Sequence, residues 1–279
     1  MRRPALRLDP SVQVILVGGI GSLLITVVAL LLAFNAARTS RANETHDLQA
    51  QADAAAHEAA RFLRERIDTL RAIARAPGLH DGQPETDPQL LESLRGVSGF
   101  VVVSLVDAQG RVRASSEPLP TSGVWVGDRD FVQDILRTHQ PSVGSAVIGR
   151  LVPEPLVPIG VPFEWSPGQF DGVLTGGFPL ANTKGLRFSV SGDLQIIGRS
   201  GTLLFDATRQ RTPLEDMHSW TNFTRVTEGG RGTFRGEGLH AGDDDSVTAY
   251  ARVPEQDWVI VLSRPAAALY ADEIGRAHV

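Results

Sequence analysis

The sequence contains no cysteine, which excludes a disulfide-stabilised scaffold without indicating a compartment. It also lacks a cluster of lysines and arginines that would follow a phosphate backbone, so no nucleic acid is expected as a partner. The seven histidines are scattered and form no HExxH pair, which argues against a zinc site. No glycine-rich phosphate loop, nucleophile elbow, kinase signature or cyclase signature occurs. We therefore expect no catalytic residue, metal or cofactor in this chain.

Charged residues are missing from one long stretch, Ser11 to Ala37. A helix needs about 20 mostly apolar residues to cross the hydrocarbon core of a bilayer, and this stretch is longer than that. A secretory signal peptide is the alternative, and small residues such as Ala36 leave cleavage open. The apolar part of a signal peptide, however, usually spans only about 7–15 residues. The length favours a retained transmembrane helix over residues 11–37.

The residues on either side of this stretch predict its orientation. The flanking arginines are Arg2, Arg3 and Arg7 before it and Arg38 and Arg41 after it. Positive residues favour the cytoplasmic side of a membrane, and the short segment 1–10 needs no translocation if it stays there. The sequence thus predicts a single-pass protein of the bacterial cytoplasmic (inner) membrane. Its amino terminus is cytoplasmic and its large domain is extracytoplasmic.

Composition describes the rest of the chain as an ordinary folded protein. Hydrophobic residues make up 42% and charged residues 21%, with a net charge of -5. Roughly 240 residues follow the apolar stretch, enough for one large domain or two small ones. The 28 glycines and 17 prolines predict many turns and short strands.

A long extracytoplasmic helix is predicted over residues 38–80, most regular from about Asn43 to Ala76. Its apolar residues recur at steps of three and four, which places them on one stripe. They are Leu48, Ala52, Ala55, Ala59, Phe62 or Leu63, Ile67, Leu70 and Ile73. Pro77-Gly78 ends the pattern. Such a stripe suits packing on the same chain and equally suits pairing with a second copy in a homodimer.

Residues 81–190 predict a first unit of mixed helix and strand. Asp87-Pro88 opens a short helix through Leu94, and Asp128 is expected to cap a helix from Arg129 to about Thr138. Strands are expected at 100–106, 111–115, 142–148, 156–163 and 170–178. The prolines within 156–163 place that strand at a sheet edge or in a loop.

Residues 191–272 predict a second, shorter unit of the same kind. A linker helix over 182–190 leads into a hairpin of strands 194–198 and 202–206. Further strands are expected at 232–235, 246–253 and 258–263. The predicted fold class is α+β, with two antiparallel-sheet units in tandem, each with helices on one side.

Four features of the chain resemble the double Cache sensor domain, a PAS-like extracellular module of bacterial transmembrane signalling receptors. They are the anchor followed by a long helix, the hairpin from Val106 to Val112 with Ser115-Ser116, the helix opening Gly127-Asp128-Arg129-Asp130-Phe131, and the closing strand from Pro254 to Pro265. The resemblance covers about residues 38–271. It implies a membrane-distal unit (81–190) that holds a small-molecule pocket and a membrane-proximal unit (191–272).

The resemblance implies a ligand site around the helix that begins near Arg129. The candidate residues are Trp125, Arg129, Asp130 and Phe131. Arginine is a two-pronged donor suited to a carboxylate, and the aromatic side chains would form walls around it. The alternative is that Arg129 pairs with Asp128, Asp130 or another surface carboxylate, and that Phe131 is a core residue.

The sequence departs from the subgroup of this family that binds amino acids. That subgroup has an aromatic pair directly after the arginine and an aspartate on a late strand for the ligand's ammonium. Here Asp130 interrupts the aromatic pair, and the strand Leu174-Thr175-Gly176-Gly177-Phe178 has no acid. An amino-acid ligand is therefore disfavoured, and a carboxylate, another small metabolite or no ligand remain open.

Three alternative interpretations are a calcium site, a hydrolase and a protein-interaction adaptor. Asp243-Asp244-Asp245 lacks the spaced ligands of a calcium loop and is expected at a hydrated hairpin tip. A membrane-anchored hydrolase would require Ser115 or Ser145 beside His139 and a buried carboxylate. A protein-interaction adaptor would have no ligand pocket.

The end of the chain carries a further expectation. Residues 273–279 resemble translated sequencing adapter, so we interpret them as a non-native tail on a truncated receptor. In receptors of this architecture the commonest output domain is a histidine kinase, with a diguanylate cyclase or chemoreceptor domain as alternatives.

Overall fold

The computed structural model describes residues 10–81, 83–164, 169–180, 188–198, 200–208, 210–240 and 245–268. For residues 10–25, 33, 36–42 and 97 it describes the backbone without the side chain. Contacts divide the chain into two compact units, one of Met1–Asp47 with Tyr270–Val279 and the other of Leu48–Leu269. The predicted cytoplasmic segment 1–10 lies almost wholly outside the described residues, and the predicted tail 273–279 lies wholly outside them.

A single helix, α1 (Pro10–Ala74), contributes to both units. The backbone of the predicted transmembrane segment 11–37 is part of this helix, but the side chains of its first fifteen residues fall outside the described part. In the described part of the chain, no helix combines the length and the apolar character required to span a membrane. The long helix predicted over 38–80 ends at Ala74 and is followed by the short 3-10 helix η1 (Pro77–Leu79).

From Leu48 onward the apolar stripe of α1 packs on the chain's own sheets. Nearly all the stripe residues are buried, and Ile67 is half-buried. The opposite face carries ion pairs within the helix, such as that between Arg61 and Glu65. The sequence pattern allowed this stripe to pack on its own chain or against a second copy, and the structure shows packing on its own chain.

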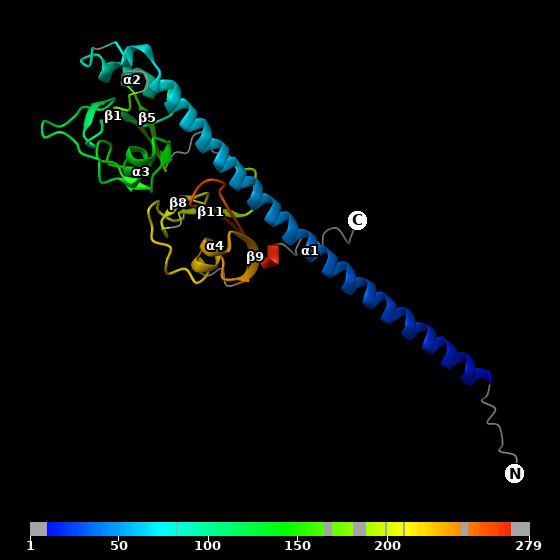
Figure 1. Cartoon of the computed structure of the whole chain (residues 1–279). Coiled ribbons are helices and arrows are strands. Elements are labelled where there is room, and N and C mark those ends of the chain that lie inside the picture. Colours follow the sequence, from blue (N-terminus) through cyan, green and yellow to red (C-terminus); the bar gives the residue numbers. More distant parts are fainter. Residues whose placement is uncertain are drawn as a thin grey trace. The chain divides into compact units, whose positions relative to one another are not determined.

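The first sheet has six antiparallel strands. They are β1 (Val102–Asp107), β2 (Val112–Ser115), β3 (Ser142–Val143), β4 (Val147–Ile148), β5 (Pro155–Phe163) and β6 (Gly172–Pro179). Their order is β2-β1-β6-β5-β3, and β4 also pairs with β5. The helices beside this sheet are α2 (Asp87–Ser98) and α3 (Asp130–Thr138). Figure 1 shows both beside their strands.

Alternation along the strands assigns the two faces of the first sheet to different helices. A Cβ atom added to Gly176 on β6 would lie 3.0 Å from Leu70 of α1. A Cβ atom added to Gly160 on β5 would lie 2.5 Å from Ile135 of α3. Successive residues of a strand point to opposite faces, so α1 covers one face and α3 the other.

Three predictions about the first sheet and the helices beside it are corrected. β5 is an interior strand, between β6 and the short strands β3 and β4. Its Pro158 is tolerated because it lies opposite the gap between those two strands, where no ladder hydrogen bond is required of its nitrogen. Helix α2 continues to Ser98 and ends where Gly99 adopts a left-handed φ of 75°. Asp128 makes no cap, since the N-cap residue of α3 is Arg129 and has no capping side-chain bond.

The second sheet has five antiparallel strands in the order β8-β7-β11-β10-β9. The strands are β7 (Asp193–Gly198), β8 (Leu203–Asp206), β9 (Arg231–Gly236), β10 (Ser246–Arg252) and β11 (Trp258–Pro265), with the helix α4 (Phe223–Gly229) beside them. This order repeats that of the first sheet, so the α+β class with two tandem antiparallel sheets is confirmed. Of the predicted linker helix, residues 182–187 lie outside the described part, and 188–190 are not helical.

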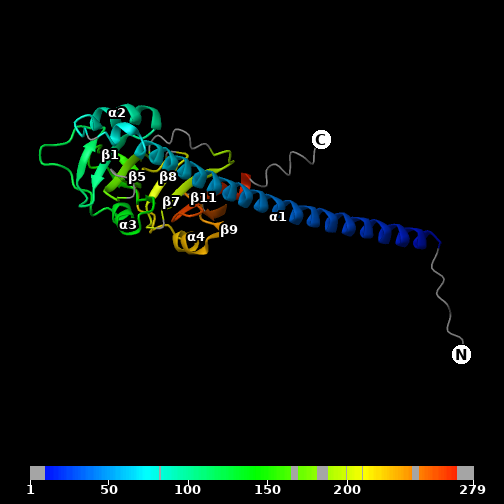
Figure 2. The same cartoon turned by 45° about the horizontal axis from the view of Figure 1, so that its top comes forward.

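Polar contacts attach the second sheet to α1. Gln49 donates from Nε2 to the carbonyl oxygen of Tyr250 at 3.2 Å. Asp53 pairs with the guanidinium of Arg231, with an N–O distance of 2.6 Å. The views in Figures 1 and 2 agree that the Leu48–Ala74 part of α1 runs beside both sheets. Helix α1 therefore packs against both sheets.

Candidate ligand-binding site

A small cavity of about 70 Å³ lies on the face of the first sheet away from α1. Two loop segments border it, 124–131 before and at the start of α3, and 147–152 around β4. Seven of the lining residues are valines, the polar ones include Ser104 and Thr175, and none is acidic. Since about 10–15 Å³ by this measure holds one water molecule, the cavity has room for about five non-hydrogen atoms. It is an apolar space suited to a small ligand.

Arg129 lines this cavity from the start of α3. As the N-cap residue it has extended backbone angles, a φ of −75° and a ψ of 135°. Its Nη2 donates to the carbonyl oxygen of Ile148 at 3.3 Å, across the border of the cavity. Neither Asp128 nor Asp130 is paired with it, because both bind other groups. The guanidinium therefore remains able to accept an additional anionic partner.

Phe131 combines the two roles considered for it. Its side chain is buried, in a core cluster with Val132 and Ile135 of the same helix. The same ring lines the cavity. It is therefore a core residue whose ring also forms a wall of the cavity.

Trp125 and Asp130 lie near the cavity but are not among its lining residues. The Trp125 indole is 52% exposed and donates from Nε1 to the carbonyl oxygen of Gln109 at 2.9 Å. The Asp130 carboxylate accepts from the backbone nitrogen of Ser145 at 3.0 Å and from its hydroxyl at 2.6 Å. Trp125 and Asp130 thus hold the border segments in place, whereas Arg129 and Phe131 face the cavity.

Arg150, which no sequence motif indicated, also lines the cavity. Its guanidinium forms a two-pronged ion pair with Asp128, with both N–O distances 2.6 Å, and also donates to the carbonyl oxygen of Trp125. Hydrogen bonding to Arg150 is the largest cause of the lowered pKa of the Asp128 carboxyl. The same bond raises the pKa of Arg150. No local pattern reveals this arginine, because its partner is 22 residues earlier in the chain.

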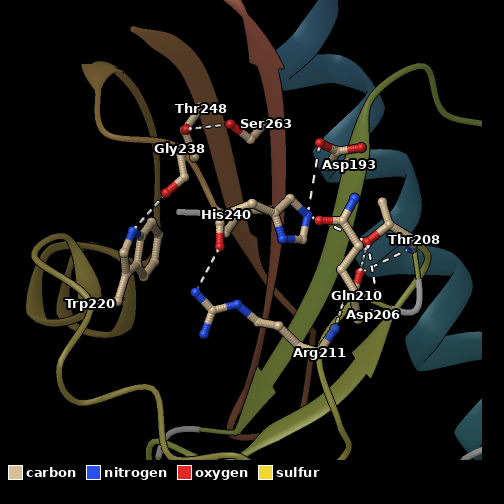
Figure 3. A network of polar contacts seen from close by, with 11 residues as sticks. Asp193, Asp206, Thr208, Gln210, Arg211, Trp220, Gly238, His240, Thr248 and Ser263 are labelled. Carbon is tan, nitrogen blue, oxygen red and sulfur yellow. Dashed lines mark hydrogen bonds and ion pairs between the residues drawn. The ribbon is translucent and has the colours of Figure 1, made fainter. Parts of the chain in front are cut away.

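The corresponding face of the second sheet is filled by large side chains. Trp220 and Phe234 have ring centroids 6.5 Å apart, and Phe234 lies 6.3 Å from Tyr250. Met217 and Phe223 belong to the same buried cluster. Figure 3 shows the Trp220 indole bonded to Gly238, at 2.9 Å from Nε1 to the carbonyl oxygen. The space that remains open in the first sheet is occupied by aromatic rings in the second.

Polar residues at one end of this face bond to one another. Arg211 donates from Nη2 to the carbonyl oxygen of Leu239 at 3.0 Å, next to His240 (Figure 3). The hydroxyls of Thr248 and Ser263 are 3.1 Å apart and buried. Arg211 thus ties the segment 238–240 to the loop after β8, and the two hydroxyls join β10 to β11.

The residues of the alternative sites have other partners. The Ser115 hydroxyl lies 3.0 Å from that of Ser104, and the His139 ring stacks on Phe170 with centroids 4.3 Å apart. The Ser145 hydroxyl donates to Asp130, so the structure does not bring these groups together as a nucleophile and base. Of the three aspartates considered for calcium, Asp245 is paired with Arg235, and the other two lie outside the described residues. No group of three metal-binding side chains occurs among the residues described.

Two tandem sheets of one strand order on a shared helix, the first with an arginine-bordered apolar cavity, define a sensor-type ligand-binding domain. A family model described as Cache domain matches residues 36–272. The chain therefore belongs to the Cache-domain family and is a double Cache sensor domain, as its sequence predicted. Domains of this family are sensing modules and not enzymes. No curated protein sequence matches the chain.

Solved structures with the same fold include ligand-binding domains of bacterial chemoreceptors. The domain of Pseudomonas fluorescens CtaA in complex with L-isoleucine is 15% identical, with a TM-score of 0.66 over 86% of this chain and 99% of that one. The domain of Campylobacter jejuni Tlp3 in complex with L-norvaline is 12% identical, with a TM-score of 0.65 over 84% and 95%. The extracellular domain of the putative histidine kinase rpHK1S-Z16 is 18% identical, with a TM-score of 0.60 over 85% and 98%. At these identities the likeness concerns the fold.

Proposed function

We propose that the cavity of the first sheet binds a short aliphatic carboxylate and that the protein senses this ligand. The observation that carries the proposal is the lining itself, which is mostly apolar, with Arg129 at the border and no acidic residue among the described lining residues. An arginine guanidinium binds a carboxylate through two parallel charge-assisted hydrogen bonds. The valines would surround the hydrocarbon part of the ligand.

The size of the cavity supports a ligand of three or four carbon atoms. A volume of about 70 Å³ accommodates about five non-hydrogen atoms, which is the size of propionate. The relatives named above were solved with isoleucine and norvaline, which are larger and carry an ammonium group. Among the described residues that line the cavity, none is an acid that could pair with an ammonium. The ligand class proposed here is therefore a carboxylate without an amino group.

Calorimetric titration of the full chain in detergent tests the proposal. Propionate and isobutyrate are expected to bind, whereas propionamide, which has no negative charge, is not. Arg129→Gln should weaken binding at least about tenfold, since it removes a charge-assisted hydrogen bond worth roughly 1.5–3 kcal/mol. Arg137→Gln is the matched control, because Arg137 is on the same helix but pairs with Asp134 away from the cavity. If none of the carboxylates bind, the adaptor interpretation replaces this one.

We further propose that residues 11–37 anchor the domain in the bacterial inner membrane, with the domain outside the cytoplasm. No charged residue occurs in this stretch. The apolar side chains described within it are 45–65% exposed, and they are Val27, Val28, Leu30, Leu31, Leu32 and Phe34. With no charged residue in the stretch, no side of the helix is charged, which is typical of a membrane span.

The absence of cysteine makes this orientation simple to test. A single cysteine introduced at the exposed Thr121 would be the only thiol in this sequence. A membrane-impermeant maleimide should label Thr121→Cys in intact spheroplasts. Labelling that requires lysis would place the domain in the cytoplasm and contradict the proposal.

For the output of the receptor we propose a histidine kinase, with a chemoreceptor or a diguanylate cyclase as the alternatives. The support is the likeness to the extracellular domain of a putative histidine kinase, which has a higher identity but a lower TM-score than the CtaA chemoreceptor domain. Sequencing the genomic reading frame beyond codon 272 tests this. A dimerisation and ATP-binding domain there would support the proposal, and a methyl-accepting or cyclase domain would contradict it.

A further inference from the structure

Arg150 is a second carboxylate-binding group at the cavity, and in this structure an internal carboxylate occupies it. Its Nη1 donates to Oδ1 of Asp128 and its Nη2 donates to Oδ2, both at 2.6 Å. This is the two-pronged geometry with which arginine binds the carboxylate of a small molecule. Asp128 therefore makes with Arg150 the contact that a ligand's carboxylate would make.

The ion pair is accessible to solvent. The Arg150 side chain is 35% exposed and that of Asp128 is 43% exposed. A carboxylate in solution can reach the guanidinium without unfolding of the sheet. Ion pairs with this exposure are weak, so a competing anion can replace the internal one.

Both arginines connect the same two border segments of the cavity. Arg129 extends from the 124–131 segment to the carbonyl oxygen of Ile148, and Arg150 extends from the 147–152 segment to Asp128 and to the carbonyl oxygen of Trp125. β4, within the second segment, has only two residues. Exchange of the carboxylate on Arg150 therefore removes one of the side-chain links between the two segments.

We propose that Asp128 is a built-in competitor, which a ligand's carboxylate displaces from Arg150 when the ligand enters the cavity. The inference deepens the proposed function and depends on it. If the ligand binds only to molecules in which Arg150 is not paired with Asp128, its apparent dissociation constant equals the intrinsic one divided by the fraction of such molecules. If Asp128 occupies Arg150 in about four molecules of five, its removal tightens binding about fivefold.

Titration of the full chain in detergent with sodium propionate tests the inference. Asp128→Asn keeps the size of the side chain but cannot form the two-pronged ion pair, so propionate should bind about fivefold more tightly than to the native chain. Asp134→Asn is the matched control, because Asp134 lies on α3 and pairs with Arg137 outside the cavity. The control should bind propionate like the native chain. Thermal unfolding of each variant verifies that it is folded.

A second variant identifies the group that is released. Arg150→Gln should weaken propionate binding. Adding Asp128→Asn to this variant should not raise its affinity for propionate, because the effect of Asp128→Asn acts through Arg150. If native chain binds propionate and folded Asp128→Asn binds no more tightly, the inference is wrong and the proposed function stands. If Asp128→Asn binds propionate and the native chain does not, the inference is supported. If neither chain binds any carboxylate of the panel, the proposed function fails and the inference fails with it.

Discussion

The two sheets share a strand order but differ in what lies on the face away from α1. Both open with a hairpin whose register shifts at one place, between Leu105 and Val106 in the first sheet and between Ile196 and Ile197 in the second. In the first sheet valines leave a cavity of about 70 Å³. In the second the rings of Trp220 and Phe234 fill the corresponding face. The comparison shows that topology provides two equivalent faces and that side-chain volume decides which one can hold a ligand.

The largest expected effect comes from emptying the filled face. Trp220→Ala removes a buried ring and the hydrogen bond to Gly238, so the free energy of unfolding should fall by about 3–5 kcal/mol. Chemical denaturation measures this change. Propionate binding by the first sheet should persist in the folded variant. A loss below about 1 kcal/mol would show that the second sheet is less tightly packed than its contacts indicate.

The two hairpin turns offer a matched pair of glycines. Gly110 has a φ of 79° and Gly201 a φ of 84°, so alanine is strained at both positions. A Cβ atom at Gly110 would lie 2.4 Å from the Cα atom of Gly127, which is backbone and cannot move aside. A Cβ atom at Gly201 would meet the side chain of His218, which is exposed and can move aside. We expect Gly110→Ala to cost about 2–3 kcal/mol of unfolding free energy and Gly201→Ala about 1 kcal/mol.

Gly110→Ala should lower the free energy of unfolding more than Gly201→Ala does. Denaturant titration of both variants under one set of conditions measures this difference. Equal costs would mean that the segment around Gly127 yields as easily as a surface side chain. Gly110→Ala should also weaken propionate binding, because Gly127 belongs to the border of the cavity.

A second pair compares added volume on the two faces. Val261→Ile places an extra methylene group in the filled core and should lower the free energy of unfolding by about 1–3 kcal/mol. Val106→Ile, on a strand that lines the cavity, can extend into open space and should change stability by less than about 1 kcal/mol. It should nevertheless weaken propionate binding by occupying that space. Equal destabilisation by the two substitutions would contradict the difference between the faces.

The smallest effect concerns pH and the Asp128–Arg150 pair. Because the folded-state pKa of Asp128 is lowered by Arg150, the pair stabilises the fold above the ordinary aspartate range near pH 4. This contribution is lost as pH falls through the lowered pKa. The side chains are more than a third exposed, so solvent screening limits it to less than about 1 kcal/mol. The native chain should melt slightly above Asp128→Asn at pH 7, and the two melting temperatures should converge toward pH 2.

Local patterns were sufficient to predict most elements of the fold. The apolar stripe from Leu48 to Ile73 predicted a helix and its buried face, since that periodicity depends only on helix geometry. Turn residues predicted both hairpins. The interior position of β5 was missed because its prolines are acceptable only opposite a gap in the neighbouring strands, and that gap is a feature of the assembled sheet.

The candidate site was predictable only in part. Arg129 and Phe131 were found from their motif, and both line the cavity. The motif also pointed to Trp125 and Asp130, which instead hold neighbouring segments through Gln109 and Ser145. Which residue of such a motif faces a cavity depends on the direction of each side chain after packing.

The sequence by itself determined the two repeated sheet patterns, the uncharged stretch from Ser11 to Ala37 and the absence of thiol chemistry. These follow from residue type and spacing along the chain. Only the tertiary structure decided that Arg150 joins Arg129 at one cavity and that Asp128 occupies its guanidinium. Groups 22 residues apart meet only when the strands and loops between them are packed, so no local pattern records their contact.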